Sequence, residues 1–253
     1  MDTPVPDKSG AVRRLRDHLA DVRRLREAVR QTPALARDRL ALREWQAGRL
    51  ARTHRDLLDS SRYGVVAAFF LSDLYGPKDF AARDEGIARI LPTLARVLPA
   101  TALDAIALAV ELDALSERLD LAVARNLRSG QPQGPLAVAE ASYAEAYRAA
   151  APRSERERQI GLVVRIGTEL DRLARKRLIA GAIAMTEAPA RAGGLGALHD
   201  FLARGFRTFR AMRGADEFLA TIAARETRII AQLYDGAPQP FAFDRRSGEA
   251  PKD

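Results

Sequence analysis

The segment TALDAIALAVELDALSERLDLAVARNLR, residues 101–128, decides the fold class of this chain. It contains neither proline nor glycine, and its large apolar residues recur at intervals of three and four. This spacing places them on one face of an α-helix, because the helix has 3.6 residues per turn. The segment therefore predicts one long helix that packs against others through this face. The face consists of Leu108, Leu112, Leu115, Leu119 and Val123.

The same period continues on both sides of this segment, and no stretch alternates Val, Ile or Thr with polar residues as a strand would. Thr32 and Pro33 are typical of a helix start, so the first two helices should form an antiparallel hairpin. The sequence predicts an all-α, bundle-like domain of about eight or nine helices. Beyond 101–128, helices are expected at about 11–30, 32–59, 63–75, 80–98 with a kink near Pro92, 136–150, 153–186, 195–213 and 215–235.

The domain organisation follows from where this period stops. Residues 1–10 and 236–253 are rich in Pro, Gly and charge, so both termini are expected to be disordered. Residues 11–235 should form a single domain, and residues 129–135, SGQPQGP, are a candidate internal linker.

The composition excludes several classes of protein. The chain of 253 residues has no cysteine and only three histidines, which excludes disulfides and thiolate metal sites. No apolar run approaches the roughly 18 residues of a membrane span, and the N-terminus lacks the basic-then-apolar order of a signal peptide. The sequence therefore predicts a cytoplasmic protein without a membrane span.

The net charge of +8 invites a nucleic-acid interpretation, so its distribution matters. Residues 1–60 carry 14 basic and 9 acidic side chains, whereas residues 61–151 carry 9 and 11. Acidic residues alternate with the arginines of the first helix, as on a solvated helix face. Nucleic acid is therefore an unfavoured partner.

Two stretches carry a resemblance to a known family: FFLSDLYGPKDFAARDEGIARILP, residues 69–92, and ELDALSERLD, residues 111–120. Through them the chain resembles an uncharacterised family of helical bacterial proteins with an FFLxDLYGPKDF-type motif. The resemblance implies an all-helical single domain. It implies no activity, cofactor or functional residue, because the family has no known function.

Three carboxylates share a second face of the long helix: Asp113, Glu117 and Asp120, at positions i, i+4 and i+7. Clustered carboxylates could bind a divalent metal ion or supply an acid or base with a raised pKa. Alternatively, Arg165, Arg172 or another cation pairs with this face and the cluster is structural. No Glu-x-x-His pair, which di-iron bundles use, occurs in the sequence.

Four further residues are candidates for a pocket or a helix junction. His54 lies at the margin of an apolar helix face, where a half-buried structural histidine is the alternative. Tyr75, Lys78 and Asp79 surround a Gly-Pro turn beside apolar rings, which either fixes a helix junction or borders a binding pocket.

These observations favour a helical interaction or scaffold protein that works through a protein partner or by self-association. The alternative is an enzyme or metal-dependent oxidase with a carboxylate site between helices. No cofactor is indicated, and a divalent metal belongs only to the alternative.

Overall fold

The structure is a computed structural model, and it describes residues 7–74, 100–176 and 183–242 together with residues 86, 88–89, 91–93, 95–96, 98 and 181. In this part of the chain the regular structure is helical and no strand occurs. The all-α prediction is confirmed. None of the helices described is long and apolar enough to cross a membrane.

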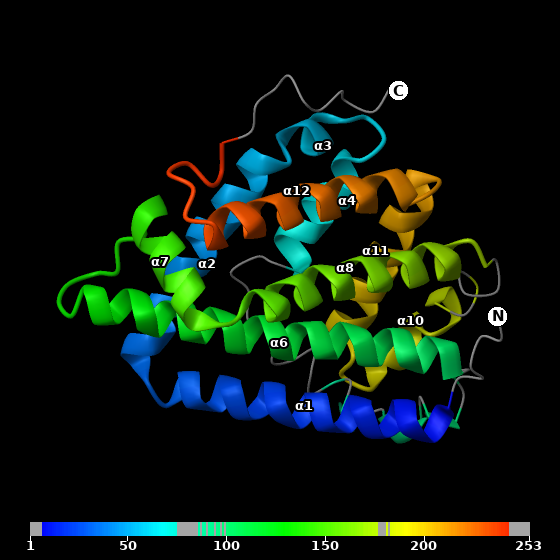
Figure 1. Ribbon diagram of the computed structural model, residues 1–253. Helices are drawn as coiled ribbons and strands as arrows, with labels where there is room; N and C mark the ends of the chain where they lie inside the picture. Colours follow the sequence, from blue (N-terminus) through cyan, green and yellow to red (C-terminus); the bar gives the residue numbers. More distant parts are fainter. Residues whose placement is uncertain are drawn as a thin grey trace.

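Helix α6 (Ala100–Gly130) is the central element, as the long period of its sequence predicts. Figure 1 shows α1 (Lys8–Arg30) beside it on one side and α8 (Arg153–Ala174) on the other. Helices α2 (Pro33–Thr53) and α7 (Glu140–Ala150) also pack on α6, towards its C-terminal end.

The predicted apolar face of α6 is buried or half-buried along its whole length. Leu115, Leu119 and Val123 are buried, whereas Leu108 and Leu112 are partly buried against Leu162 and its neighbours. Because apolar area removed from water contributes roughly 25 cal/mol per Å², this stripe is a main source of cohesion.

The first helix begins three residues earlier than expected. The Asp7 side chain accepts hydrogen bonds from the backbone N–H groups of Ser9 and Gly10, and so starts α1 at Lys8. A tight turn leads into α2, as in the predicted hairpin, but α2 turns away from α1 in Figure 1. The two helices pack mainly on α6 rather than on each other.

A second group of helices covers α8 from the other side (Figure 1). It consists of α12 (Asp216–Tyr234), α11 (Gly196–Met212) and α4 (Gly64–Phe69). Their shared core includes Tyr63, Phe209 and Phe218, all of them buried. The described residues also form short elements: α3 (Arg55–Asp59), the π-helical turn η1 (Phe70–Leu74) and α10 (Glu187–Ala192).

Helix α8 ends at Ala174, well before the predicted end at residue 186. The N–H of Arg175 closes the last turn on the carbonyl of Asp171, and the Arg175 guanidinium pairs with the Asp171 carboxylate at 2.6 Å. This capped end separates α8 from the segment that leads to α10.

The candidate linker at residues 129–135 is a fixed loop. Arg128 donates to the carbonyls of Gln131 at 2.7 Å and Gly134 at 3.1 Å. The Gln131 side chain donates to the Ala137 carbonyl at 2.7 Å and accepts from its N–H. These bonds satisfy backbone groups in an irregular segment, so α7 begins only at Glu140 rather than at residue 136.

The C-terminal segment packs on the core beyond the predicted domain end at residue 235. The Phe241 ring lies 5.6 Å from that of Trp45 and 5.9 Å from that of Tyr143. An aromatic pair of this kind contributes about 0.5–1.5 kcal/mol beyond its buried area. Phe241 therefore contributes to this core although it lies beyond residue 235.

Candidate functional site

The candidate metal ligands on α6 face the first two helices. Glu117 is fully removed from solvent, and both of its carboxylate oxygens accept hydrogen bonds from the Arg39 guanidinium. Arg43 donates to the same carboxylate at 2.8 Å, and the Nε atom of Arg26 lies 3.9 Å from it. Burial alone would raise the pKa of Glu117, but the Arg39 hydrogen bond and the three positive charges outweigh it and hold the pKa below its ordinary value.

The two neighbouring carboxylates are engaged in the same way. Asp113 accepts a hydrogen bond from Arg26 at 2.8 Å. Asp120 accepts one from Gln46 at 3.1 Å and lies 3.6 Å from the Nε atom of Arg43. Burial raises the pKa of Asp120. The positive charge of Arg43 and the hydrogen bond from Gln46 lower this pKa, but by less than burial raises it. Two carboxylates three residues apart thus have pKa values displaced in opposite directions.

The polar residues of the two helices have matching spacings. Arg39, Arg43 and Gln46 of α2 stand at i, i+4 and i+7, the same spacing as Asp113, Glu117 and Asp120 of α6. The contacts follow this order, because Arg39 binds Glu117, Arg43 binds Glu117 and approaches Asp120, and Gln46 binds Asp120. This matched set, completed by Arg26 on Asp113, is called the ion-pair ladder here.

The ion-pair ladder bears on the metal hypothesis for Asp113, Glu117 and Asp120. Among the residues that the structure describes, no group of three His, Asp or Glu side chains is placed to hold a metal ion. The guanidinium donors use the oxygen lone pairs that a metal would need. The geometry therefore favours ion pairing, with Arg26, Arg39 and Arg43 as the cations in place of Arg165 or Arg172.

His54 lies at the junction of α2 and α3, where it interrupts the helix predicted from 32 to 59. Its Nε2 atom is 2.9 Å from Glu226 of α12, and Arg49 binds the two oxygens of Glu226 at 2.7 and 2.6 Å. Burial raises the pKa of Glu226, but the charges and hydrogen bonds of Arg49 and His54 lower it to about 2. The structure thus unites His54 with Glu226, not with the carboxylates of α6.

A histidine paired with a carboxylate is also an arrangement that general bases use. Both His54 and Glu226 are more than nine-tenths buried, and Arg49 already neutralises the carboxylate. A substrate would have to open the helix junction to reach this pair, so a structural role fits it better. The other three pocket candidates, Tyr75, Lys78 and Asp79, lie outside the residues that the structure describes.

Sequence analysis also missed the buried cation Arg156. Arg156 is 2% exposed, its guanidinium lies 3.9 Å from the centroid of the Tyr147 ring, and its Nε and Nη2 atoms make no hydrogen bond. Nothing in the charged first turn of α8 sets Arg156 apart from its neighbours. For the ion-pair ladder a signal did exist, since Arg39, Arg43 and Gln46 have the same i, i+4 and i+7 spacing as the three carboxylates.

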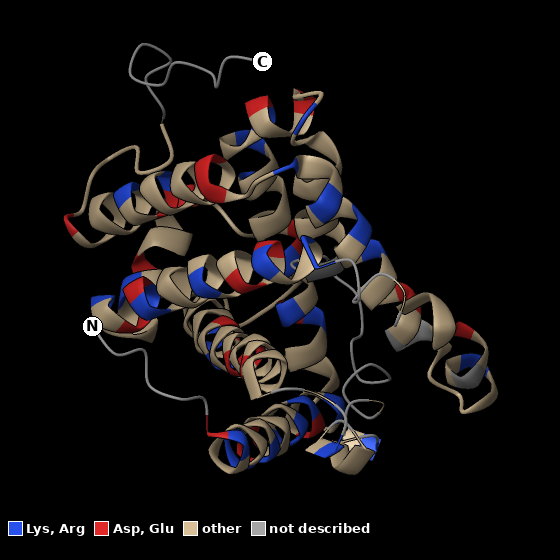
Figure 2. Ribbon diagram, turned by 90° about the vertical axis from the view of Figure 1, so that its right-hand side faces the viewer, with Lys and Arg blue, Asp and Glu red and all other residues tan. Residues whose placement is uncertain are grey.

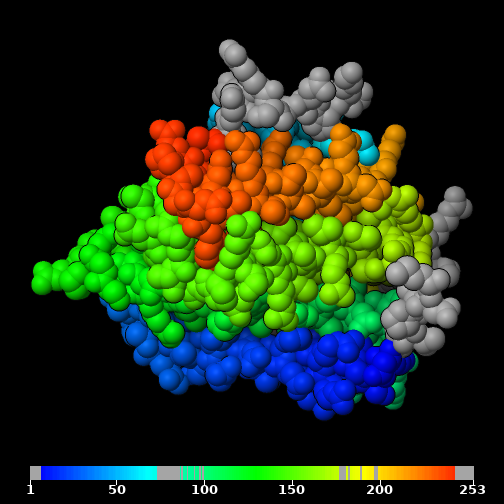
Figure 3. Space-filling model, in the orientation of Figure 1, coloured from blue at the N-terminus to red at the C-terminus, as the bar shows by residue number. Residues whose placement is uncertain are grey.

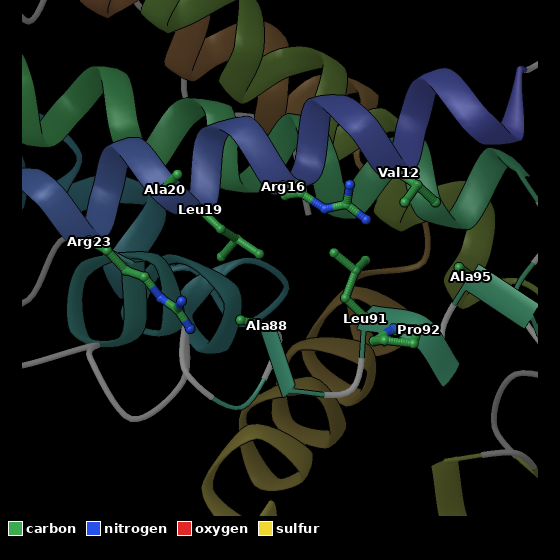
Figure 4. Close-up of a pocket in the computed structure, with 9 residues that line it drawn as sticks. All are labelled: Val12, Arg16, Leu19, Ala20, Arg23, Ala88, Leu91, Pro92 and Ala95. Carbon is green, nitrogen blue, oxygen red and sulfur yellow. The ribbon is translucent and has the colours of Figure 1, made fainter.

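A groove lies on the surface of the molecule, beside α1. Figure 4 shows Leu19 of α1 opposite Leu91, with Arg16 and Arg23 extending from α1 on either side of Leu19. The groove has a volume of about 370 Å³, within the range of roughly 300–1,000 Å³ that ligand sites occupy. Its lining is mostly apolar and comprises Val12, Arg16, Leu19, Ala20, Arg23, Ala88, Leu91, Pro92 and Ala95.

The arginines on the outer face of α1 are available to a partner. Arg13, Arg16 and Arg23 are exposed and form no ion pair with the described residues, whereas Arg14 is paired with Asp104 at 2.6 Å. Figure 3 shows α1, in blue, along one edge of the molecule. Acidic and basic residues are otherwise interleaved over the helices seen in Figure 2, so the positive charge does not form one continuous face there.

The chain was compared with protein families, curated proteins and solved structures. A family model described as Domain of unknown function (DUF8198) matches residues 25–240. No curated protein and no solved structure matches the chain. The match covers the ion-pair ladder and most of the described helices, whereas most of α1, including Arg13, Arg16 and Arg23, precedes it.

Proposed function

The chain belongs to this DUF8198 family, and we propose that it is a helical interaction protein that binds a protein partner or a second copy of itself through the outer side of α1. The single observation that carries the proposal is the groove beside α1, which combines a mostly apolar lining with the exposed arginines Arg16 and Arg23. Apolar centres bordered by charged groups are typical of protein interfaces.

Two features of the interior support the same proposal. The carboxylates that could have served catalysis are held by arginines in the ion-pair ladder, and the His54–Glu226 pair is buried. These groups are therefore engaged inside the fold and are not presented to other molecules. The α1 wall of the groove precedes residue 25, so the proposal concerns this chain rather than the whole family.

The cellular setting is part of the proposal. We expect a bacterial, cytoplasmic protein, since the chain has no cysteine and is rich in alanine and arginine, a composition that GC-rich bacterial genomes favour. Fractionation of the producing cell with an antibody against the chain would test the location, and recovery in a membrane or extracellular fraction would contradict it.

Binding is tested with the purified full chain and two double variants. R16E/R23E reverses the charges of the groove, and R165E/R207E reverses two exposed arginines of α8 and α11 that also lack an ion pair with the described residues. Light scattering after size exclusion measures self-association. Affinity capture identifies partners, and each one is confirmed as a purified binary complex.

We expect a complex or an oligomer that R16E/R23E weakens and R165E/R207E retains, because reversed charges at an interface repel the partner. A chain that is monomeric and captures no partner that R16E/R23E disturbs would contradict the proposed function.

A further inference from the structure

The groove beside α1 has a regular arrangement of charge along its length. Arg16 and Arg23 are seven residues apart on one helix, which places them two turns, or about 10 Å, from each other along the axis. The exposed Ala20 lies between them, and the exposed Pro92 stands on the facing wall (Figure 4). Leu19 and Leu91, which also line the groove, belong to the buried core beneath it. The groove thus offers a positive charge, an apolar centre and a second positive charge in that order.

This order selects the shape of the occupant. A ligand with a single carboxylate or phosphate can neutralise one arginine but leaves the other about 10 Å away. An α-helix with acidic residues at i and i+7 and an apolar residue at i+3 or i+4 has anionic groups at the same distance and an apolar group between them. We infer that the groove binds an acidic amphipathic helix of a partner protein; this inference rests on the proposed function and specifies its partner.

The dimensions of the groove agree with such a helix. A volume of about 370 Å³ corresponds to roughly a dozen water molecules, which one or two apolar anchor side chains would displace. Helices that bind in grooves insert anchors of this kind at i, i+3 or i+4 and i+7. The two arginines would also accelerate the encounter with an acidic partner.

A second copy of the chain fits the groove less well. The exposed acidic residues of α1 are Asp17, Asp21 and Glu27, and they alternate with arginines. Asp21 is already paired with Arg24 at 3.0 Å and Glu27 with Arg30 at 2.5 Å. Two α1 helices placed side by side would bring arginines against arginines, and like charges at an interface are costly.

The experiment uses a displayed library of helical peptides of about 18 residues, five turns, with randomised positions around fixed leucine anchors. The library is selected on the full chain, and the affinity of the selected peptides is measured on four proteins. These are the wild type, R16E/R23E, the control R165E/R207E, and A20F, which narrows the groove from an exposed position without changing any charge.

We expect selected peptides to carry Asp or Glu seven residues apart. Their affinity should fall about tenfold or more with R16E/R23E, since two rim ion pairs are lost and replaced by repulsion. It should also fall with A20F and stay unchanged with R165E/R207E. Lysine at the two acidic positions of the peptide should restore binding to R16E/R23E.

Selected peptides without the acidic spacing, or peptides indifferent to R16E/R23E and A20F, would overturn the inference. So would a free fatty acid that raises the melting temperature of the wild type but not of A20F, or an oligomer that R16E/R23E dissociates, because each assigns the groove to another occupant. If a captured protein partner depends on the groove but these peptides do not bind, only the inference fails and the proposed function stands.

Discussion

The guanidinium of Arg39 donates hydrogen bonds to both carboxylate oxygens of Glu117, 78 residues further along the chain. Arg43 binds the same carboxylate at 2.8 Å, and no part of Glu117 reaches solvent. A buried carboxylate is tolerated when its lone pairs are satisfied and its charge is balanced, and both conditions hold here.

Replacement of Glu117 by Gln should destabilise the fold strongly. Among the described residues, the change removes the only carboxylate that binds the half-buried Arg39 and leaves the buried Arg43 with the more distant Asp120 alone. Loss of one partner of a buried pair costs about 3–5 kcal/mol. Urea unfolding of E117Q measures the cost. The matched control is E155Q, which removes the exposed pair with Arg118 and should cost about 1 kcal/mol or less. Equal effects of the two variants would contradict the burial-based argument.

Divalent metals should leave the stability of the protein unchanged. Asp113, Glu117 and Asp120 are each bound to Arg26, Arg39, Arg43 or Gln46, so these three carboxylates are not free to hold a metal. Thermal melts with EDTA, Mg²⁺, Mn²⁺ and Fe²⁺ are the measurement. A metal-dependent rise in melting temperature that the D113N/E117Q/D120N variant lacks would establish the metal site after all.

Acid should weaken the fold through Glu226. Its pKa of about 2 in the folded protein lies below the ordinary value of 4.5. Its contribution to the free energy of unfolding is therefore complete above about pH 4.5 and is lost as the pH falls towards 2. The difference corresponds to about 3 kcal/mol. Urea unfolding between these pH values should show a smaller loss for E226Q, in which the group cannot titrate. The exposed control E44Q should behave as the wild type does.

Two glycines of α8 should respond to alanine with opposite signs. A Cβ at Gly167 would lie 2.4 Å from a methyl group of the buried Leu219 of α12, so G167A should cost about 1–3 kcal/mol by overpacking. At Gly161 nothing lies within 4 Å, and G161A should stabilise the helix by roughly 0.5–1 kcal/mol. Thermal melts compare them, and a stabilising G167A would show that α8 and α12 are less tightly packed than described.

Removal of the Phe241 ring should alter the environment of the sole tryptophan, Trp45, 5.6 Å away. The F241A variant exposes that indole to water, so its fluorescence should shift to longer wavelength, and the fold should lose about 1–2 kcal/mol. The exposed neighbour Gln239 provides the control Q239A, which should leave the spectrum as it is. An unchanged spectrum in F241A would place the C-terminal segment away from Trp45.

Much of the fold could be predicted, because helical period is a local property. The apolar stripe of α6 is buried where Leu115 and Leu119 predict it. The end of α8 at Ala174 and the start of α7 at Glu140 were missed, since side-chain bonds from Arg175 and Gln131 decide those boundaries.

The partners of the candidate site were harder to predict. The shared face of Asp113, Glu117 and Asp120 could be predicted from spacing. The side chains that bind this face come mostly from α2, about 75 residues earlier in the chain, and they decide whether the face binds a metal or forms ion pairs. The equal spacing of Arg39, Arg43 and Gln46 was visible in the sequence, yet only a crossing of α2 with α6 brings the two sets together. The groove beside α1 combines segments whose pairing no local pattern indicates.

The ion-pair ladder also has a consequence for how the chain reaches its native state. Apolar stripes tolerate a slide of one helix along another by a turn of about 5.4 Å, because leucines still meet leucines. A slide of α2 by one turn on α6 would take one of the two arginines out of reach of Glu117 and would move Gln46 away from Asp120. The ladder therefore lowers the free energy of one alignment of these two helices relative to its neighbours, a distinction that the apolar core alone would not make.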